Sequence, residues 1–456
     1  MKSRLAWFLV LTLLLSALCG ATVSAEEEKI EITIWGIDPT GVGDGNAEMI
    51  AALQAAFPQY EIKCEAMPAS GGYDTQDLSK LTAAVAAGDP PDIAVLNAPF
   101  IMEVASRGML EPINAYIEDL GVDLRETFYE YTIDEMTFQG DIWGLPSDTD
   151  CRILYYNKDM FEAAGLDPEA PPTTWDQLLE YAEKLTKYDE NGNYEQIGFI
   201  PNFGNSWLYL YAIQNGGSFV SEDGRTITLN APENVEALEF MVEGYDLLGG
   251  AEKVNAYSSS FLTGADDPFL RGQVAMLINC DNSTANYARY APDLNYGVAY
   301  APTPTGENFK TWSGGWGYGI MKGSQHPKES TEVMMWLCTQ GPIEKLAGQK
   351  VYNDENGLFT LPNLYACHAT NDTLYDLYVK DFEYEIPREA FAFAVEALDT
   401  SMPLPVSPVG QLLWSHHASA IDAAIYHNGE PQDILDEATW TVQQELDTFW
   451  RKNDSL

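Results

Sequence analysis

Aromatic side chains stand beside carboxylate and amide side chains at the ends of several strand-like runs of the sequence. Trp35 ends the run IEITIW, Asn97 ends the third such run, and Asp148 and Asp150 follow Pro146. An indole ring offers a flat face to apolar C–H groups, and carboxylates and amides hydrogen-bond to hydroxyls. This chemistry suits a neutral sugar, although a single Trp at a strand end is as often a core residue.

Similar residues follow the later runs of the chain. Ligands of open α/β sheets bind beyond the strand ends, so these positions are expected to converge on one site. The candidate ligand-binding residues are Trp35, Asn97, Asp148, Asp150, Trp207, Asp281, Asn282, Trp312, Gly314 and Trp316.

Motifs for catalysis are missing from the sequence. It contains no G-x-S-x-G, no H-E-x-x-H and no G-x-x-x-x-G-K-[ST]. The pair His416-His417 is placed on an expected surface helix without a spaced carboxylate partner, so no metal site is expected. The segment 189–195 has a D-x-N-x-N spacing, but Tyr194 and Ile200 stand where a calcium loop needs Gly and Glu, which favours a hairpin turn. We expect neither an enzyme nor a cofactor.

Composition limits the partners. The formal net charge is −45, and because the first 25 residues carry two basic and no acidic side chains, the remaining 431 residues stand at −47. Such acidity disfavours nucleic acid and anionic membrane surfaces, which attract clustered Lys and Arg. A chain of this length exceeds one ordinary core and predicts two lobes.

The first 25 residues have the features of an export signal. Lys2 and Arg4 precede a run of thirteen mostly apolar residues, and Val23-Ser24-Ala25 fits the small-x-small cleavage rule. Cleavage after Ala25 is expected. The alternative is lipid attachment at Cys19, which Leu18 disfavours because the residue before an acylated Cys is normally small.

Five cysteines remain after residue 25, namely Cys64, Cys151, Cys280, Cys338 and Cys367. They form no C-x-x-C and no zinc spacing, and most lie in apolar runs. Buried free thiols are therefore expected, with a single disulfide as the open alternative.

The elements that must position these residues follow from apolar periodicity. Strands are expected at 30–35, 60–64 and 92–96, with helices at about 47–57 and 78–87 between them, which predicts a sheet with helices on both faces. Further on, Thr174 and Gln177 form a capping box for a helix whose apolar face contains Leu178, Leu179 and Leu185.

The segment 140–186 contains three spaced motifs in order. It reads G-x-x-x-G-L-P, then L-Y-Y-N-K-D-x-F-x-x-A-G-L-x-P, then P-P-x-T-W-D-x-L-L-x-x-A-x-K-L-T. Earlier stretches read F-P-x-Y-E-I-K, L-x-A-A-V-A-A-G-D-P-P-D-I and G-x-L-E-P-I, and later ones read F-x-x-G-x-x-A-M and WSGGWGYGI. Together these motifs resemble the family 1 extracellular solute-binding proteins, the maltodextrin-binding-like sugar receptors of ABC importers. Landmarks extend over residues 30–450.

The resemblance implies an α/β, two-lobe periplasmic-binding-protein fold of type II, the Venus-flytrap architecture, in which each lobe is a sheet flanked by helices. Three crossings would join the lobes. Their expected extents are 26–147 with 303–340 for the N-terminal lobe, and 148–302 with 341–456 for the C-terminal lobe.

The resemblance also implies a function. We expect an exported periplasmic or cell-surface monomer that captures a carbohydrate, an oligosaccharide, and delivers it to the permease subunits of an ABC importer. The ten candidate residues would line the cleft, with Trp207, Trp312 and Trp316 stacking on sugar faces and Trp175 belonging to the core. The alternatives are a secreted carbohydrate-active enzyme and a surface lectin that use the same cleft.

Overall fold

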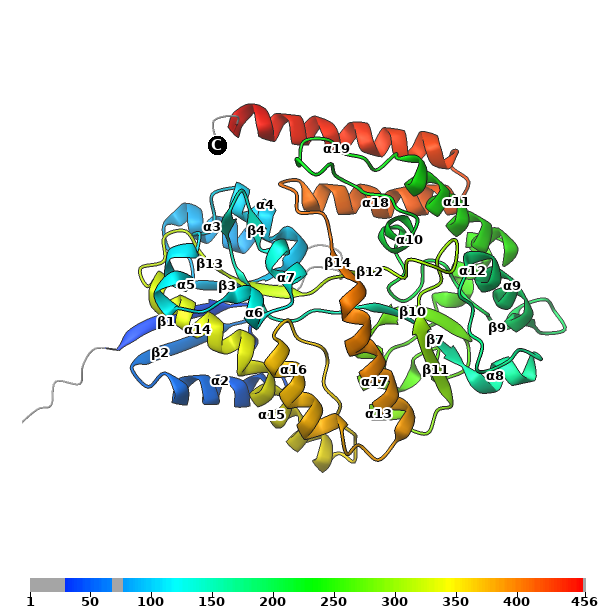
Figure 1. Ribbon diagram of the computed structural model, residues 1–456, viewed down its shortest axis with the longest axis horizontal. Coiled ribbons are helices and arrows are strands. Elements are labelled where there is room, and N and C mark those ends of the chain that lie inside the picture. The colour runs from blue at the N-terminus through cyan, green and yellow to red at the C-terminus, as the bar shows by residue number, and fades with distance from the viewer. Residues whose placement is uncertain (1–28, 68–76, 454–456) are drawn as a thin grey trace, which may run out of the picture.

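The computed structural model describes residues 29–67 and 77–453 (Figure 1). The expected signal segment, the cleavage site after Ala25 and Cys19 lie outside the described residues. Two sheets, one at each side of the molecule, are covered by helices (Figure 1). The predicted two-sheet α/β architecture is therefore confirmed, and we call the two halves the larger-sheet lobe and the smaller-sheet lobe.

The larger sheet has the strand order β2-β1-β3-β13-β6. Its first three strands are parallel, and β13 runs antiparallel to both β3 and β6. Alternate residues of β3 point to opposite faces, since Ile93 packs in one apolar cluster and Ala94 and Leu96 pack in another. Helices therefore cover both faces of this sheet, as the alternating pattern predicted. The strands are β1 (Ile30–Trp35), β2 (Tyr60–Glu65), β3 (Ile93–Asn97), β6 (Leu145–Pro146) and β13 (Trp316–Ile320).

The smaller sheet has the order β10-β7-β11, and both neighbours run antiparallel to β7. All six residues of β7 are buried, because this strand is central and has protein on both faces. Three two-stranded pairs complete the described sheets. The remaining strands are β7 (Arg152–Asn157), β10 (Met276–Cys280), β11 (Tyr296–Tyr300), β4 (Thr137–Phe138) with β5 (Asp141–Ile142), β8 (Lys187–Tyr188) with β9 (Tyr194–Gln196), and β12 (Thr311–Ser313) with β14 (Ser401–Pro403).

Helices make up most of the remaining described chain. They are α2 (Asn46–Ala56), α3 (Ser79–Ala87), α4 (Ile101–Ser106), α5 (Asn114–Leu120), α6 (Leu124–Thr127), α7 (Glu130–Glu135), α8 (Lys158–Ala163), α9 (Trp175–Leu185), α10 (Leu208–Gln214), α11 (Pro232–Leu247), α12 (Ala251–Ser258), α13 (Asn282–Tyr290), α14 (Pro327–Thr339), α15 (Gly341–Glu355), α16 (His368–Leu374), α17 (Glu385–Ala397), α18 (Gly410–Ile425) and α19 (Pro431–Asn453), with the short turns η1 (Ala98–Phe100), η2 (Gly264–Asp266), η3 (Tyr375–Val379) and η4 (Leu398–Thr400). Within residues 29–67 and 77–453, none of these helices has the length and apolarity that a membrane span requires.

Two local predictions from the sequence are confirmed. The side chain of Thr174 accepts a hydrogen bond from the N–H of Gln177, and the Gln177 side chain accepts one from the N–H of Thr174. The capping box of α9 is therefore complete. Asp189 accepts from the N–H groups of Asn191 and Asn193 in the turn between β8 and β9, which makes this segment a hairpin.

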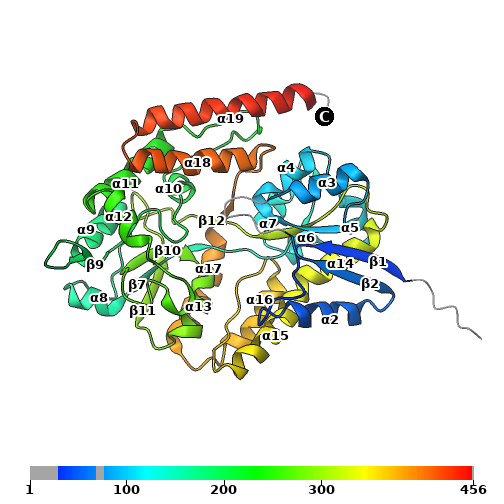
Figure 2. The ribbon, with the colours of Figure 1, turned by 180° about the vertical axis from the view of Figure 1, so that it is seen from behind.

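Within the described residues, two connections join the strands of the two sheets. The segment 147–151 leads from β6 to β7, and the segment 301–315 leads from β11 through β12 to β13. The expected third crossing near Gly341, and the division of lobes that goes with it, stay predictions. Helix α15 packs against α2 and α14 beside the larger sheet, and α17 packs against β11 of the smaller sheet. Helices α18 and α19 lie together along the top of both views (Figure 2).

His417 corrects the expectation of a surface histidine pair. Its side chain is fully buried among aromatic rings, whereas His416 is half-buried on the same helix, α18.

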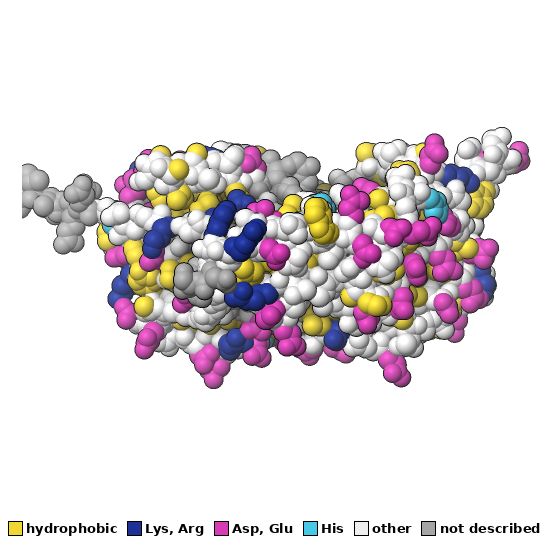
Figure 3. Space-filling model, turned by 90° about the horizontal axis from the view of Figure 1, so that it is seen from above, with side chains coloured by type: hydrophobic (Ala, Val, Ile, Leu, Met, Phe, Trp, Pro, Cys, Tyr) yellow, Lys and Arg dark blue, Asp and Glu magenta, His cyan; other side chains and the backbone are white. Residues whose placement is uncertain are grey.

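The five described cysteines are free thiols, and all but Cys64 are buried. Carboxylates are spread over the face seen from above, and the Lys and Arg side chains of that face gather toward the larger-sheet lobe (Figure 3).

Candidate ligand-binding cleft

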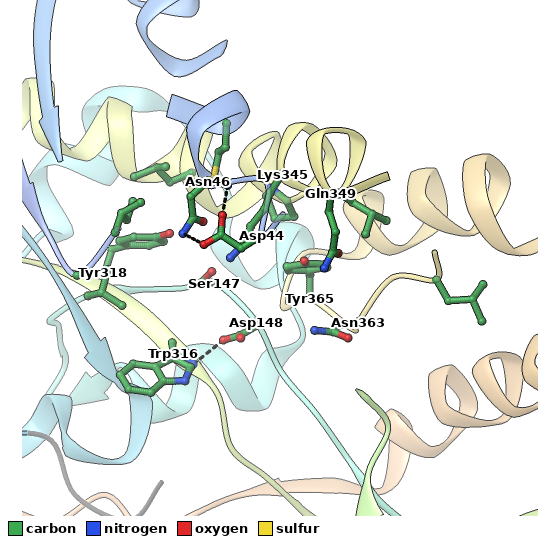
Figure 4. A pocket seen from close by; sticks show the side chains of 18 residues that line it. Asp44, Asn46, Ser147, Asp148, Trp316, Tyr318, Lys345, Gln349, Asn363 and Tyr365 are labelled. Atoms are coloured by element: carbon green, nitrogen blue, oxygen red, sulfur yellow. Dashed lines mark hydrogen bonds between the residues drawn. The ribbon is translucent and has the colours of Figure 1, made fainter. Parts of the chain in front are cut away.

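A cavity of about 370 Å³ opens where three strands of the larger sheet end. One wall comes from the loop after β1, one from the start of the first crossing and β13, and one from α15 and the segment 361–365 (Figure 4). The lining residues are Gly36, Ile37, Asp44, Asn46, Met49, Val95, Ser147, Asp148, Trp316, Tyr318, Leu337, Pro342, Lys345, Leu346, Gln349, Leu361, Asn363 and Tyr365.

Trp316 and Asp148 are bonded to each other across two segments that are far apart in sequence. The N–H of Trp316 donates to Oδ1 of Asp148 at 2.6 Å, and the N–H of Ser147 donates to the Trp316 carbonyl at 2.8 Å. Both backbone groups of Trp316 are therefore held by the first crossing. Trp316 is 39% exposed. Its side chain lies next to Asp148 at the cavity (Figure 4).

The environment of Asp148 disfavours the charged form of its carboxyl. Burial raises the pKa of its carboxyl to about 6, and the nearby Asp150 adds to the increase, whereas the Trp316 N–H and the charge of Lys345 oppose it. A carboxyl in this state accepts hydrogen bonds from hydroxyls above pH 6 and also donates one below it.

The loop after β1 and the helix α15 supply the other polar groups. Asn46 donates from its side chain to Asp44 at 2.9 Å, which orients the Asp44 carboxylate at the start of α2. Lys345 and Gln349 lie four residues apart on α15 and therefore share one helix face. The cavity thus places two carboxylates, one ammonium and several amides around an exposed indole.

Sequence reasoning missed most of these groups. Asp44 and Asn46 lie between the first expected strand and the first expected helix, in a Gly-rich segment without a motif for binding. Lys345 and Gln349 have the i, i+4 spacing of a polar helix face, a signal the sequence does contain. Whether this polar face lines a cavity or is exposed to solvent depends on how α15 packs in the fold. The sequence pattern does not specify that packing.

A second group of predicted residues forms a buried network next to the cavity. Arg152, which is 3% exposed, pairs with Asp150, and its guanidinium carbon lies 3.2 Å from the ring centroid of Trp312. The N–H of Gly314 donates to Asp150 at 2.6 Å. Trp312 is 4% exposed, so in this structure its ring packs in the core and does not face the cavity.

Asp281 directly follows β10 on the other side of this network. It is 5% exposed and accepts from the N–H of Cys151 at 3.2 Å. Burial raises the pKa of Asp281 to about 7, with a further increase from the charge of Asp150. This carboxyl ties the first crossing to β10 rather than lining the cavity.

The remaining predicted residues are dispersed. Asn97 pairs with Trp316 in the register of β3 and β13. Asn282 is exposed and lines a neighbouring cavity described below. The ammonium nitrogen of Lys80 lies 3.9 Å from the ring centroid of Trp35. The ring centroids of Trp207 and Trp414 are 5.4 Å apart. Of the ten candidates only Asp148 and Trp316 line the first cavity, and their role in binding stays a prediction.

No group of three or more His, Cys, Asp or Glu side chains with the spacing of a metal site occurs among the residues that the structure describes. The polar groups of the cavity are hydrogen-bonding groups and charges without a nucleophile–base pair of the triad kind. The arrangement is suited to hold a polar molecule with an apolar face.

Comparison with known proteins points to one family. The family described as bacterial extracellular solute-binding protein matches residues 43–341, which is more than half of the chain. A binding protein of Brucella abortus (strain 2308) is 28% identical over 261 residues, covering 57% of this chain and 60% of that protein. The sn-glycerol-3-phosphate-binding periplasmic protein of Escherichia coli (strain K12) is 30% identical over 263 residues, covering 55% and 56%. The matches therefore span about 60% of the length of these curated relatives.

Solved structures match over nearly the whole chain. CpMnBP1 with mannobiose bound is 27% identical with a TM-score of 0.72, covering 91% of this chain and all of that one. Lmo0181 of Listeria monocytogenes, a substrate-binding protein of an ABC transporter in complex with cycloalternan, has the same TM-score at 23% identity, covering 92% and 100%. The sugar-binding protein MalE of Xanthomonas citri has a TM-score of 0.69 at 18% identity, covering 93% and 100%. The last two similarities concern the fold alone.

Proposed function

The chain belongs to the bacterial extracellular solute-binding proteins, and on that premise we propose that it captures a neutral oligosaccharide and delivers it to the permease subunits of an ABC importer. The observation that carries this proposal is the exposed ring of Trp316 beside a cavity lined by Asp148, Asp44 and amide side chains. An indole face for C–H groups and carboxylates for hydroxyls are the two contacts that a sugar ring requires.

Charge favours a neutral ligand over a phosphate ester. Among the described lining residues of the cavity, Lys345 is the one cation, and it shares the cavity with the carboxyls of Asp44 and Asp148. Phosphate sites normally use Arg, Lys or helix N–H groups without competing carboxylates. We therefore propose that this cavity rejects glycerol 3-phosphate, although the E. coli relatives are named for that ligand.

The mechanism is capture by closure, without a reaction. A ligand that contacts both lobes stabilises the arrangement in which they are close, and a membrane partner then selects that form. The alternatives are a secreted carbohydrate-active enzyme, which would turn over an oligosaccharide, and a surface lectin, which would bind one without any effect on transport.

A thermal-shift screen tests the proposal, because a ligand that binds only the native state raises its melting temperature. The panel contains mannobiose, mannotriose, the maltose series and glycerol 3-phosphate. We expect at least one oligosaccharide to raise the melting temperature and glycerol 3-phosphate to leave it unchanged. Stabilisation by glycerol 3-phosphate alone would contradict a sugar function.

We also propose that the protein is exported as a monomer and is cleaved after Ala25 without a lipid. Mass spectrometry of the protein recovered from its native host measures the mature N-terminus, expected at Glu26. An acylated Cys19 would contradict this part of the proposal.

A further inference from the structure

A second cavity continues the first one. Its volume is about 350 Å³, and it shares Gln349, Leu361 and Asn363 with the cavity beside Trp316. The two cavities therefore form one groove. The lining residues of the second cavity are Thr263, Gly264, Asp267, Asn282, Ser283, Ala285, Asn286, Arg289, Gln349, Asn353, Phe359, Thr360, Leu361 and Asn363.

One face of α15 lines the whole groove. Lys345 belongs to the first cavity, Gln349 belongs to both, and Asn353 belongs to the second. Residues four apart lie on the same helix face, and eight residues advance about 12 Å along the axis of a helix. A single sugar ring is shorter than this polar stripe.

Helix α13 forms the facing wall of the second cavity. Asn282, Asn286 and Arg289 follow each other at intervals of four and three residues, again on one helix face. Arg289 donates to the Asn353 side chain at 3.1 Å and so connects α13 with α15 at this part of the groove.

Four amide side chains along the groove are available to a ligand. Within the described part of the chain, the side chains of Gln349, Asn363, Asn286 and Asn282 have no hydrogen bond to the protein. Each amide offers two N–H donors and a carbonyl acceptor, whereas each sugar hydroxyl both donates one hydrogen bond and accepts others, so the two can pair without any charge. Asp267 and Arg289 both line the second cavity, which therefore also contains side chains of both charges.

We infer that the second cavity binds the further units of a neutral oligosaccharide longer than a disaccharide, whose first unit stacks on Trp316. This inference rests on the proposed function. Stacking would supply most of the contact with the ligand at Trp316 and Tyr365. Hydrogen bonds from amides would supply most of it between α13 and α15, where Phe359 is the one aromatic lining residue.

Titration calorimetry with manno- and malto-oligosaccharides of one to five units tests the inference. In the series that binds, we expect the affinity to rise at least about tenfold from the disaccharide to a longer member, or roughly 1.4 kcal/mol. Asn286→Leu should weaken the longer ligand at least about fivefold more than the disaccharide. Trp316→Ala should weaken the binding of saccharides of every length alike. Asn428 is exposed just after the end of α18, so Asn428→Leu is the surface control.

Two results would overturn the inference and leave the proposed function intact. One is an affinity that reaches its maximum with one or two units, and the other is an equal effect of Asn286→Leu on every length. If Asn286→Leu does not fold, Asn282→Leu at the exposed start of α13 measures the same ratio. Absence of binding by every saccharide would instead overturn the proposed function and this inference with it.

Discussion

The backbone N–H of Trp316 donates a hydrogen bond of 2.6 Å to the carboxylate of Asp148, and this bond joins the start of β13 to the first crossing. It holds the indole ring beside the cavity while the ring itself packs against little of the core. The bond therefore connects the strand that presents the ring to the segment on which the lobes pivot in our proposal.

Trp316→Ala should weaken sugar binding at least about tenfold, or roughly 1.4 kcal/mol. The ligand-free protein should melt within a few degrees of the wild type, because a residue that is 39% exposed leaves no closed cavity when it is truncated. Calorimetry and thermal melting measure the two effects. A variant that melts much earlier and binds normally would place Trp316 in the core.

Trp312→Ala should have the opposite effect, because the structure places this ring in the core. Truncation leaves a cavity and exposes the Arg152 guanidinium that stacks on the ring, so we expect a loss of about 3–5 kcal/mol of unfolding free energy. Trp175→Ala is the matched control, since Trp175 is 8% exposed and stacks on Phe240 at 4.4 Å. Chemical denaturation measures both. A stable Trp312→Ala protein that loses its ligand would restore Trp312 to the binding site.

Asp148→Asn should change how stability depends on pH. The pKa of Asp148 is raised in the folded protein to about 6 from an ordinary value near 3.8, so ionisation of this group destabilises the fold as pH rises from 4 to 6. The asparagine variant lacks that contribution. We expect wild-type stability to fall relative to the variant by up to about 1.4 kcal/mol per pH unit in this range. Denaturation of the ligand-free proteins measures it, and a difference that is constant with pH would contradict the raised pKa.

His417→Leu should change the pH dependence in the other direction. Burial lowers the pKa of His417 to about 3, so the unfolded chain takes up a proton as pH falls below 6.5 while the folded chain does not. Wild-type stability should therefore fall relative to the variant on acidification from pH 6.5 to 4, by up to about 1.4 kcal/mol per unit. His416→Leu controls for loss of a histidine, and an equal effect of both substitutions would contradict a role for burial.

A bound sugar should make the protein more compact. The crossings near Pro146 and Ala301 connect the two sheets, so closure about them brings Trp316 and α13 toward each other. X-ray scattering with and without the saccharide that binds measures the radius of gyration. An unchanged radius at saturating ligand would exclude closure about these crossings.

Local patterns in the sequence determined the elements and their apolar faces. The Thr174–Gln177 capping box, the hairpin at Asp189 and the parallel start of the larger sheet all depend on contacts within a few residues or on strict alternation. The order of the motifs was enough for the fold, because each motif occupies a fixed place in that architecture. Cysteine spacing likewise predicted the free thiols.

Only the tertiary structure decided which candidates face the cavity. Trp312 and Trp316 lie four residues apart in one glycine-rich stretch, and the sequence gives them the same expected role. In the structure Gly315 takes a φ of 138°, a conformation that favours Gly, and the chain passes from β12 beside β14 to β13 in the larger sheet. One ring therefore enters the core under Arg152 while the other borders the cavity, and α15 brings Lys345 and Gln349 to that cavity from a distant part of the chain. Such docking depends on long-range packing, which local sequence patterns do not encode.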